Sequence, residues 1–281
     1  MPSFTYRIVN VFTQRNNPFS GNPLCVFENG GSLDTVTMQA LALQFNLSET
    51  TFILPSSRAH ARVRIFTPRY ELPFAGHPTL GTAHVCRALG LGHRDSLTLE
   101  MAAGIFSVTA EDCTWTLKAN EPTWREVQEP RALLANMLGI AAHEIDTRPL
   151  WINAGVEQLV IPLTSEAAVR RAAPRAELLA RLGANAGAGM AYVFAPVGEQ
   201  ILARFFFQQG SAVLEDPATG SATANLGGWC LALERKLPCN FAISQGEYAG
   251  RPSTLRLQVD VGRRIFVSGD VIEIGAGLIS L

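Results

Sequence analysis

The chain has 281 residues and a formal net charge of −1, with 47% hydrophobic and 17% charged residues. Such a chain can bury a full core, is not disordered, and has the length of one large or two medium domains. It shows no Lys/Arg cluster typical of nucleic-acid binding and no apolar stretch long enough to span a bilayer, so we expect neither nucleic acid nor membrane as a partner, and a cytoplasmic location.

The first half of the chain is predicted to alternate short strands with two helices. Asp34 can cap a helix in which the apolar residues from Met38 to Phe45 recur at helical spacing. A second helix is expected over residues 79–89. The expected strands span residues 6–12, 24–27, 50–54, 63–67, 97–99, 105–109 and 114–117.

After Pro122 the expected helices cover residues 131–138, 141–145 and 166–182, with a break allowed at Pro174. The expected strands span residues 150–153, 158–163, 190–194, 201–207, 243–245, 254–259, 265–269 and 271–274. Because most strand pairs lack an intervening helix, antiparallel sheets are favoured. We place an N-terminal domain over 1–125 and a C-terminal domain over 126–281, with a final strand that can pack on the first domain.

Two short segments, residues 71–83 and 215–227, share one order of residue types. They align when Gly76 is placed on Gly220. In each, an acidic residue and a proline precede the glycine, and a run of small residues follows it. One such turn in each half predicts a duplicated fold with a site between the halves. Two unrelated glycine-rich loops are the alternative.

These turns are predicted to bind an anion. Glycine lets a ligand approach the main chain closely, and His77 or Ser221 would stand at or near the cap of the following helix. The free amides of a helix N-terminus attract carboxylate or phosphate. The helices expected over 79–89 and 222–233 are rich in glycine and alanine, so we expect each to be a central helix wrapped by sheet.

Glu49 is the candidate proton carrier, because it follows a helix on a short connection of the kind that often presents catalytic groups. Burial of such a carboxylate favours its protonated form, which suits proton transfer near neutral pH. A capping or surface role stays open for Glu49, and a role as strand-end surface charges stays open for Glu71 and Glu215. A turn-capping role for Asp216 and a structural role for His77 also stay open.

The cysteines do not indicate a metal site or a disulfide framework. They are odd in number, lack C-x-x-C spacing and have no close His or carboxylate partners, so we expect buried free thiols and no metal. The five are Cys25, Cys86, Cys113, Cys230 and Cys239.

Six ordered motifs carry a resemblance to a known family. They are Gly21-Asn22-Pro23, Ser48-Glu49-Thr50, Phe66-Thr67-Pro68, Glu71 to Gly81, Asp216 to Ala222, and Gly250-Arg251-Pro252-Ser253. Any one motif is weak, but the ordered set, from about residue 5 onward, resembles the phenazine-biosynthesis PhzF-like family, which has a diaminopimelate-epimerase-like fold.

The resemblance implies an α+β fold of two similar domains, each a mostly antiparallel β-sheet rolled around a central α-helix, with the active site in the cleft between them. It also implies an isomerase without metal or organic cofactor, commonly a homodimer. Glu49 matches the family's proton-carrying glutamate, and His77 and Asp216 match its site histidine and aspartate. The implied substrate-binding positions are Asn22, Gly76, Thr219, Gly220 and Ser221.

The chain departs from the epimerase relatives of this fold, which use a cysteine at each glycine turn. Here Ala75 and Thr219 precede the two glycines. Racemisation by two cysteines is therefore not expected.

The leading hypothesis is an isomerase that moves a proton between carbons of a small carboxylated substrate, with Glu49 as both base and acid. The alternative is a non-catalytic small-acid-binding or interaction protein on the same fold. A hydrolase or lyase with Ser221 as nucleophile is a weaker option, because the chain has no G-x-S-x-G motif.

Overall fold

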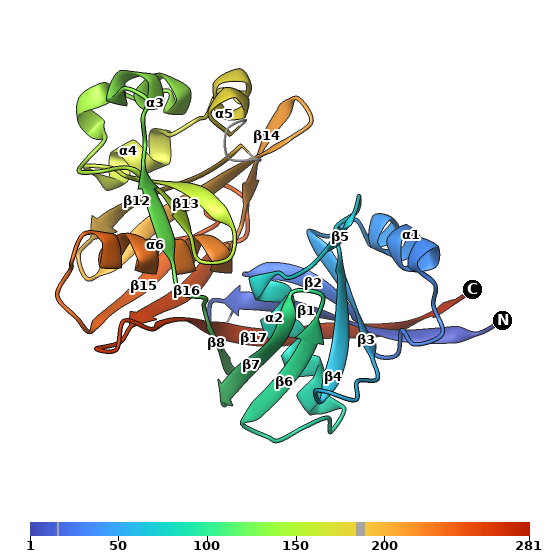
Figure 1. Ribbon diagram of the computed structural model, residues 1–281. Coiled ribbons are helices and arrows are strands. Elements are labelled where there is room, and N and C mark those ends of the chain that lie inside the picture. The colour runs from blue at the N-terminus through green and yellow to red at the C-terminus, as the bar shows by residue number, and fades with distance from the viewer. Residues whose placement is uncertain (16, 184–188) are drawn as a thin grey trace. The chain divides into compact units, whose positions relative to one another are not determined.

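The computed structural model describes residues 1–15, 17–183 and 189–281 (Figure 1). The chain divides into two compact units, one formed by Met1–Lys118 with Ser268–Leu281 and the other by Ala119–Val267. Over the described residues, no helix combines the length and the apolar character needed to cross a membrane.

The first unit is a ring of hydrogen-bonded strands around one helix. Its elements are β1 (Ser3–Thr13), β2 (Asn22–Phe27), α1 (Thr35–Phe45), β3 (Glu49–Leu54), β4 (Ala61–Phe66), β5 (Glu71–Leu72), α2 (Gly76–Ala88), β6 (Ser96–Met101), β7 (Gly104–Glu111), β8 (Thr114–Lys118) and β17 (Ile265–Ser280). Pairing runs β17-β1-β2-β3-β4-β6-β7-β8 and returns from β8 to β17. Helix α2 contacts strands on several sides of this ring.

From β10 onward the second unit repeats the order β-β-α-β-β-β-α-β-β, with two helices between β11 and β12. It contains β9 (Thr123–Glu126), α3 (Arg131–Leu138), η1 (Ala142–Glu144), β10 (Leu150–Asn153), β11 (Glu157–Pro162), α4 (Glu166–Arg171), α5 (Ala176–Gly183), β12 (Met190–Val197), β13 (Gln200–Gln209), β14 (Ala212–Asp216), α6 (Gly220–Ala232), β15 (Cys239–Gln245) and β16 (Ser253–Val259). The parallel pairs β2–β3 and β4–β6 correspond to β11–β12 and β13–β15, and α2 corresponds to α6. Among the described residues, the other strand pairs for which a register is defined are antiparallel.

The prediction that the two small-residue helices are buried is confirmed. Every residue of α6 from Ala222 to Leu231 is buried. A Cβ atom added at Gly81 in α2 would lie 2.6 Å from the Leu24 side chain, and one added at Gly227 would lie 2.8 Å from a side-chain atom of Ile265. Neighbouring strands therefore pack against helix backbone, which explains why residues with poor helix propensity are used here.

Both helices begin earlier than predicted. The N-caps are Ala75 and Thr219, whose backbones are extended and whose side chains make no capping hydrogen bond. Gly76 and Gly220 are the first helical residues. His77 and Ser221, which follow the glycines, therefore lie in the first turn, near the cap, as predicted.

Some strands differ from the sequence prediction. The short strands β5, β9 and β14 were not predicted, because they lack a clear apolar alternation. The two strands expected over 265–269 and 271–274 form the single long strand β17. This strand pairs with β1 from Ser3↔Ser280 to Thr13↔Asp270. The helix expected over 166–182 is divided in two around Pro174, the break that was allowed.

A matching ion pair stands before each glycine turn. Arg64 donates to both carboxylate oxygens of Glu71, over 2.7 and 2.6 Å, and Arg204 does the same to Glu215, over 3.1 and 2.7 Å. Each guanidinium also lies over a phenylalanine ring on its own strand. Because such bidentate pairs are geometrically specific, these two glutamates anchor the strands that lead into the turns, although Glu71 is exposed and Glu215 is half-buried.

Candidate active site

The first group of candidate residues lies where two parallel strands begin. Helix α1 connects β2 to β3, so the strands run in the same direction and Leu24 is paired with Glu49. Asn22 and Glu49 are the first residues of these strands and therefore lie at one edge. The Ser48 hydroxyl donates to Asn22 Oδ1 over 3.3 Å, which ties the two strand starts together. Glu49 is thus the first residue of β3, slightly beyond the connection on which it was predicted.

Helix α2 brings His77 to the same edge. His77 Nε2 lies 3.2 Å from Glu49 Oε2, and the two side chains are 8% and 16% exposed. Gly76, the first residue of α2, is adjacent to this contact in the chain. The structure therefore assembles Asn22, Glu49, Gly76 and His77, which come from three separate segments of the sequence, around the half-buried Glu49 carboxyl group.

The charge state of this pair follows from burial. A distance of 3.2 Å would suit an ion pair, but removal from water lowers the pKa of His77 to about 3, while a hydrogen bond with the Pro23 backbone opposes that shift. Desolvation is the larger effect because the imidazole is enclosed. We therefore treat His77 as neutral at neutral pH, where it can orient Glu49 without forming a fixed ion pair.

A neutral buried His77 has a measurable consequence for stability. Below pH 6.5 the unfolded chain binds a proton at this residue, whereas the folded chain binds it only near pH 3. The free energy of unfolding should therefore decrease as the pH is lowered from 6.5 to about 3. We expect the free energy of unfolding, measured in urea between pH 6 and pH 4, to depend less on pH in His77→Gln than in the parent protein, by about 1 kcal/mol per pH unit. A steeper slope in the variant would indicate a charged, paired His77 instead.

The second group of candidate residues belongs to the turn between β14 and α6. Asp216 ends β14, and its Oδ2 accepts a 2.5 Å hydrogen bond from the Thr219 hydroxyl. Gln245, the last residue of β15, donates to the Asp216 carbonyl over 2.9 Å and to Thr219 Oγ1 over 3.0 Å. Asp216 therefore holds the turn in shape, as the capping alternative expected, and it remains partly exposed.

The next two residues form the first turn of α6. Gly220 and Ser221 are partly exposed, whereas Ala222 and the residues after it are buried. The amides of a first helical turn have no acceptor within the helix, so this accessible end suits an anionic group. The Ser221 hydroxyl accepts a 3.0 Å hydrogen bond from Gln158 Nε2.

Each group of predicted residues is assembled within its own unit. The first contains Asn22, Glu49, Gly76 and His77, and the second contains Asp216, Thr219, Gly220 and Ser221. Three buried amide side chains that support the second group were not predicted: Gln158, Asn225 and Gln245. Each is an uncharged amide with apolar residues close to it in its strand or helix, which gave only a weak signal in the sequence.

The cysteines are not part of either group. Cys25, Cys86 and Cys230 are buried, as expected, but Cys113 is exposed and Cys239 is half-buried, so the expectation of uniformly buried thiols is wrong. Cys113 lies in the turn between β7 and β8, where no core covers it. Among the described residues, no three His, Cys, Asp or Glu side chains come together as metal ligands.

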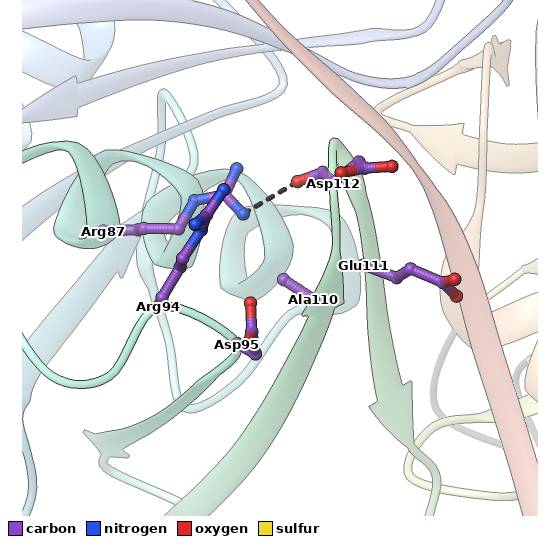
Figure 2. Close-up of a pocket in the computed structure, with 6 residues that line it drawn as sticks. All are labelled: Arg87, Arg94, Asp95, Ala110, Glu111 and Asp112. Carbon is purple, nitrogen blue, oxygen red and sulfur yellow. Dashed lines mark hydrogen bonds between the residues drawn. The ribbon is translucent and has the colours of Figure 1, made fainter.

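Figure 2 shows a polar hollow of the first unit. It is lined by Arg87, Arg94, Asp95, Ala110, Glu111 and Asp112. Arg87 is near the C-terminal end of α2 and donates to the Asp112 carbonyl over 2.7 Å. His77 is at the opposite end of that helix, about 15 Å along its axis. This hollow is therefore separate from the candidate site.

Comparison with known proteins identifies the family. The model of the family described as phenazine biosynthesis-like protein matches residues 9–275. The chain belongs to this PhzC-PhzF family. An uncharacterized isomerase of Pasteurella multocida is 38% identical, over 98% of this chain and 93% of its own. A trans-2,3-dihydro-3-hydroxyanthranilate isomerase of Pseudomonas chlororaphis is 34% identical, over 98% and 99%.

The fold of the PhzC-PhzF chain also matches solved structures. A PhzF-family phenazine biosynthesis protein of Bacillus anthracis superposes with a TM-score of 0.88, covering 100% of both chains at 22% identity. Both curated relatives are named isomerases, so the prediction of an enzyme of the isomerase class is confirmed at the level of the family.

Proposed function

We propose that this chain is a cofactor-independent isomerase that moves a proton between carbon atoms of a small carboxylated substrate. The observation that carries the proposal is the buried contact of 3.2 Å between Glu49 and His77 at the common edge of β2, β3 and α2. A carboxyl group in such a place is shielded from water, so it can hold a proton between its removal from one carbon and its return to another.

The steps balance with one carboxyl group. The Glu49 carboxylate takes a proton from a substrate carbon, and the electron pair of the broken C–H bond delocalises into the adjacent π-system. The Glu49 carboxylic acid then returns the proton to a different carbon. The product therefore has the same charge as the substrate, and Glu49 is again a carboxylate. Neutral His77 orients Glu49 or the substrate.

We propose that the second group also binds a small carboxylated molecule. The first-turn amides of α6, with Thr219 and Ser221, suit a carboxylate, and Asp216 suits a hydroxyl or amino group as a hydrogen-bond acceptor. The substrate in the Pseudomonas chlororaphis relative's name carries a carboxylate, an amino and a hydroxyl group on one ring. A cyclic hydroxy- or amino-substituted acid is therefore the substrate class that we propose.

The carbon-to-carbon proton shift differs from racemisation by paired cysteines. Ala75 and Thr219 occupy the cap positions before the two glycines, and neither can act as a thiol base. Homodimer formation stays a prediction from the family resemblance, and a cytoplasmic location stays a prediction from the sequence.

The proposal is tested by screening cyclic and linear carboxylic acids for an increase in melting temperature, since a ligand that binds the native state stabilises it. Acids that bind are then incubated with the enzyme and followed by NMR for double-bond migration and for deuterium uptake from D2O. We expect at least one stabilising acid to be isomerised. Stabilisation without isomerisation or exchange for every binding acid would favour the alternative of a non-catalytic acid-binding protein.

A further inference from the structure

A chain of buried amide side chains leads to Ser221 in the second unit. Asn225 of α6 is 0% exposed and Gln158 of β11 is 1% exposed. Asn225 Nδ2 donates to the Val156 carbonyl over 2.9 Å and to Gln158 Oε1 over 2.8 Å, and Asn225 Oδ1 accepts from the Ala154 amide over 2.8 Å. Gln158 Nε2 then donates to Ser221 Oγ over 3.0 Å.

Backbone groups fix the direction of every hydrogen bond in the series from Asn225 through Gln158 to Ser221. A backbone N–H can only donate and a backbone carbonyl can only accept, so the two backbone contacts of Asn225 admit one orientation of its amide group. The oxygen of Gln158 must then face Asn225 Nδ2. Its nitrogen must consequently face Ser221, whose hydroxyl oxygen has to accept.

This direction leaves the Ser221 hydroxyl with a hydrogen to donate. Within the part of the chain that the structure describes, its one hydrogen bond is the one that it accepts from Gln158. Ser221 is also partly exposed at the start of α6, and the backbone amides of the first turn beside it are hydrogen-bond donors too. The Ser221 hydroxyl and the first-turn amides therefore all offer hydrogen-bond donors to a ligand.

We propose that Gln158 and Asn225 are positioning residues that commit Ser221 to donate a hydrogen bond to an anionic oxygen of the substrate, its carboxylate. The inference rests on the proposed function and deepens it, because it assigns this end of α6 to the carboxylate and assigns its selectivity to two residues outside the turn. A ligand that presents a donor at this position would meet only donors and should be rejected.

The binding test uses 3-hydroxyanthranilate, the stable aromatic counterpart of the substrate in the relative's name, with calorimetric Kd values for four variants. Ser221→Ala should weaken binding about tenfold, which is typical of a lost hydrogen bond to a charged group. Gln158→Met should weaken it about threefold, because the freed hydroxyl can turn away. The double variant should match Ser221→Ala alone, and Gln258→Met, at an exposed position of β16, should match the parent.

Additive effects of the two substitutions, or an unchanged Kd in Ser221→Ala, would overturn the proposal. So would a parent protein that does not bind 3-hydroxyanthranilate. Failure of the proposed function is distinguishable, because it would appear as tight binding of acids by a parent protein that isomerises none of them.

A second measurement examines the hydrogen bond from Gln158 to Ser221 in the absence of ligand. The side-chain amide signal of Gln158 in a ¹⁵N–¹H NMR spectrum is identified by its loss in Gln158→Met. Ser221→Ala should shift this signal and speed its exchange with solvent, because the acceptor is removed. An unchanged signal would contradict the hydrogen-bond direction, even if Ser221→Ala folds and binds normally.

Discussion

Glu49→Gln should lower kcat about 10³-fold while leaving the melting temperature and the affinity for acids nearly unchanged. Glutamine has the shape of glutamate and can keep a contact with His77 at the 3.2 Å position, but it cannot carry a proton between carbon atoms. Loss of the proton carrier therefore removes a step of the reaction and not a binding contact. The measurement is the rate of isomer formation from an acid that stabilises the parent protein.

Glu111→Gln provides the matched control for this experiment. Glu111 is an exposed glutamate of the same unit that lines the remote hollow, so its replacement should leave kcat unchanged. If Glu49→Gln exchanged substrate protons with D2O at the parent rate, the assignment of Glu49 would be wrong.

Gly246→Ala should destabilise the protein by roughly 4 kcal/mol and disturb the turn that holds Asp216. Gly246 has a φ of +84°, and a Cβ atom there would lie 2.2 Å from the Arg251 carbonyl oxygen and 2.5 Å from that of Pro217. Both obstacles are backbone atoms, which cannot rotate away as a side chain can. Urea unfolding would give the free energy, and acid binding would report the turn, since Pro217 follows Asp216 directly.

Gly250→Ala in the same loop separates strain from crowding. Gly250 also has a positive φ, of +67°, but nothing lies within 4 Å of its added Cβ atom. We expect a cost of only about 1–2 kcal/mol, from the left-handed backbone alone. Equal losses in the two variants would contradict the account of Gly246, because contact with backbone oxygen would then add nothing.

The sequence predicted the helices and the glycine turns well because their causes are local. Gly81 and Gly227 indicated close packing, and the structure places strand side chains against both. Asp34 predicted the start of α1, and its side chain accepts a hydrogen bond from the Thr37 amide. Composition and spacing carry such features without reference to the rest of the chain.

The state of the candidate site could not be predicted in the same way. His77 is neutral because distant segments enclose it, and no residue next to it in the sequence reports that enclosure. The direction of the Gln158 amide likewise depends on Asn225, 67 residues away, and on two backbone groups of the β10–β11 turn. Contacts between residues remote in the sequence, and not secondary-structure propensity, decide the charge state of His77 and the orientation of the Gln158 amide.

Strand β17 imposes an order on synthesis and folding. The ring of the first unit needs β17 between β1 and β8, yet Ser3 and its partner Ser280 are separated by nearly the whole chain. On the ribosome, Ala119–Val267 emerges in full before Ser268–Leu281 does, so the second unit can reach its native pairing before the first. Until β17 appears, β1 and β8 each present an unpaired edge, and a nascent chain in this condition is exposed to aggregation and to recognition by chaperones.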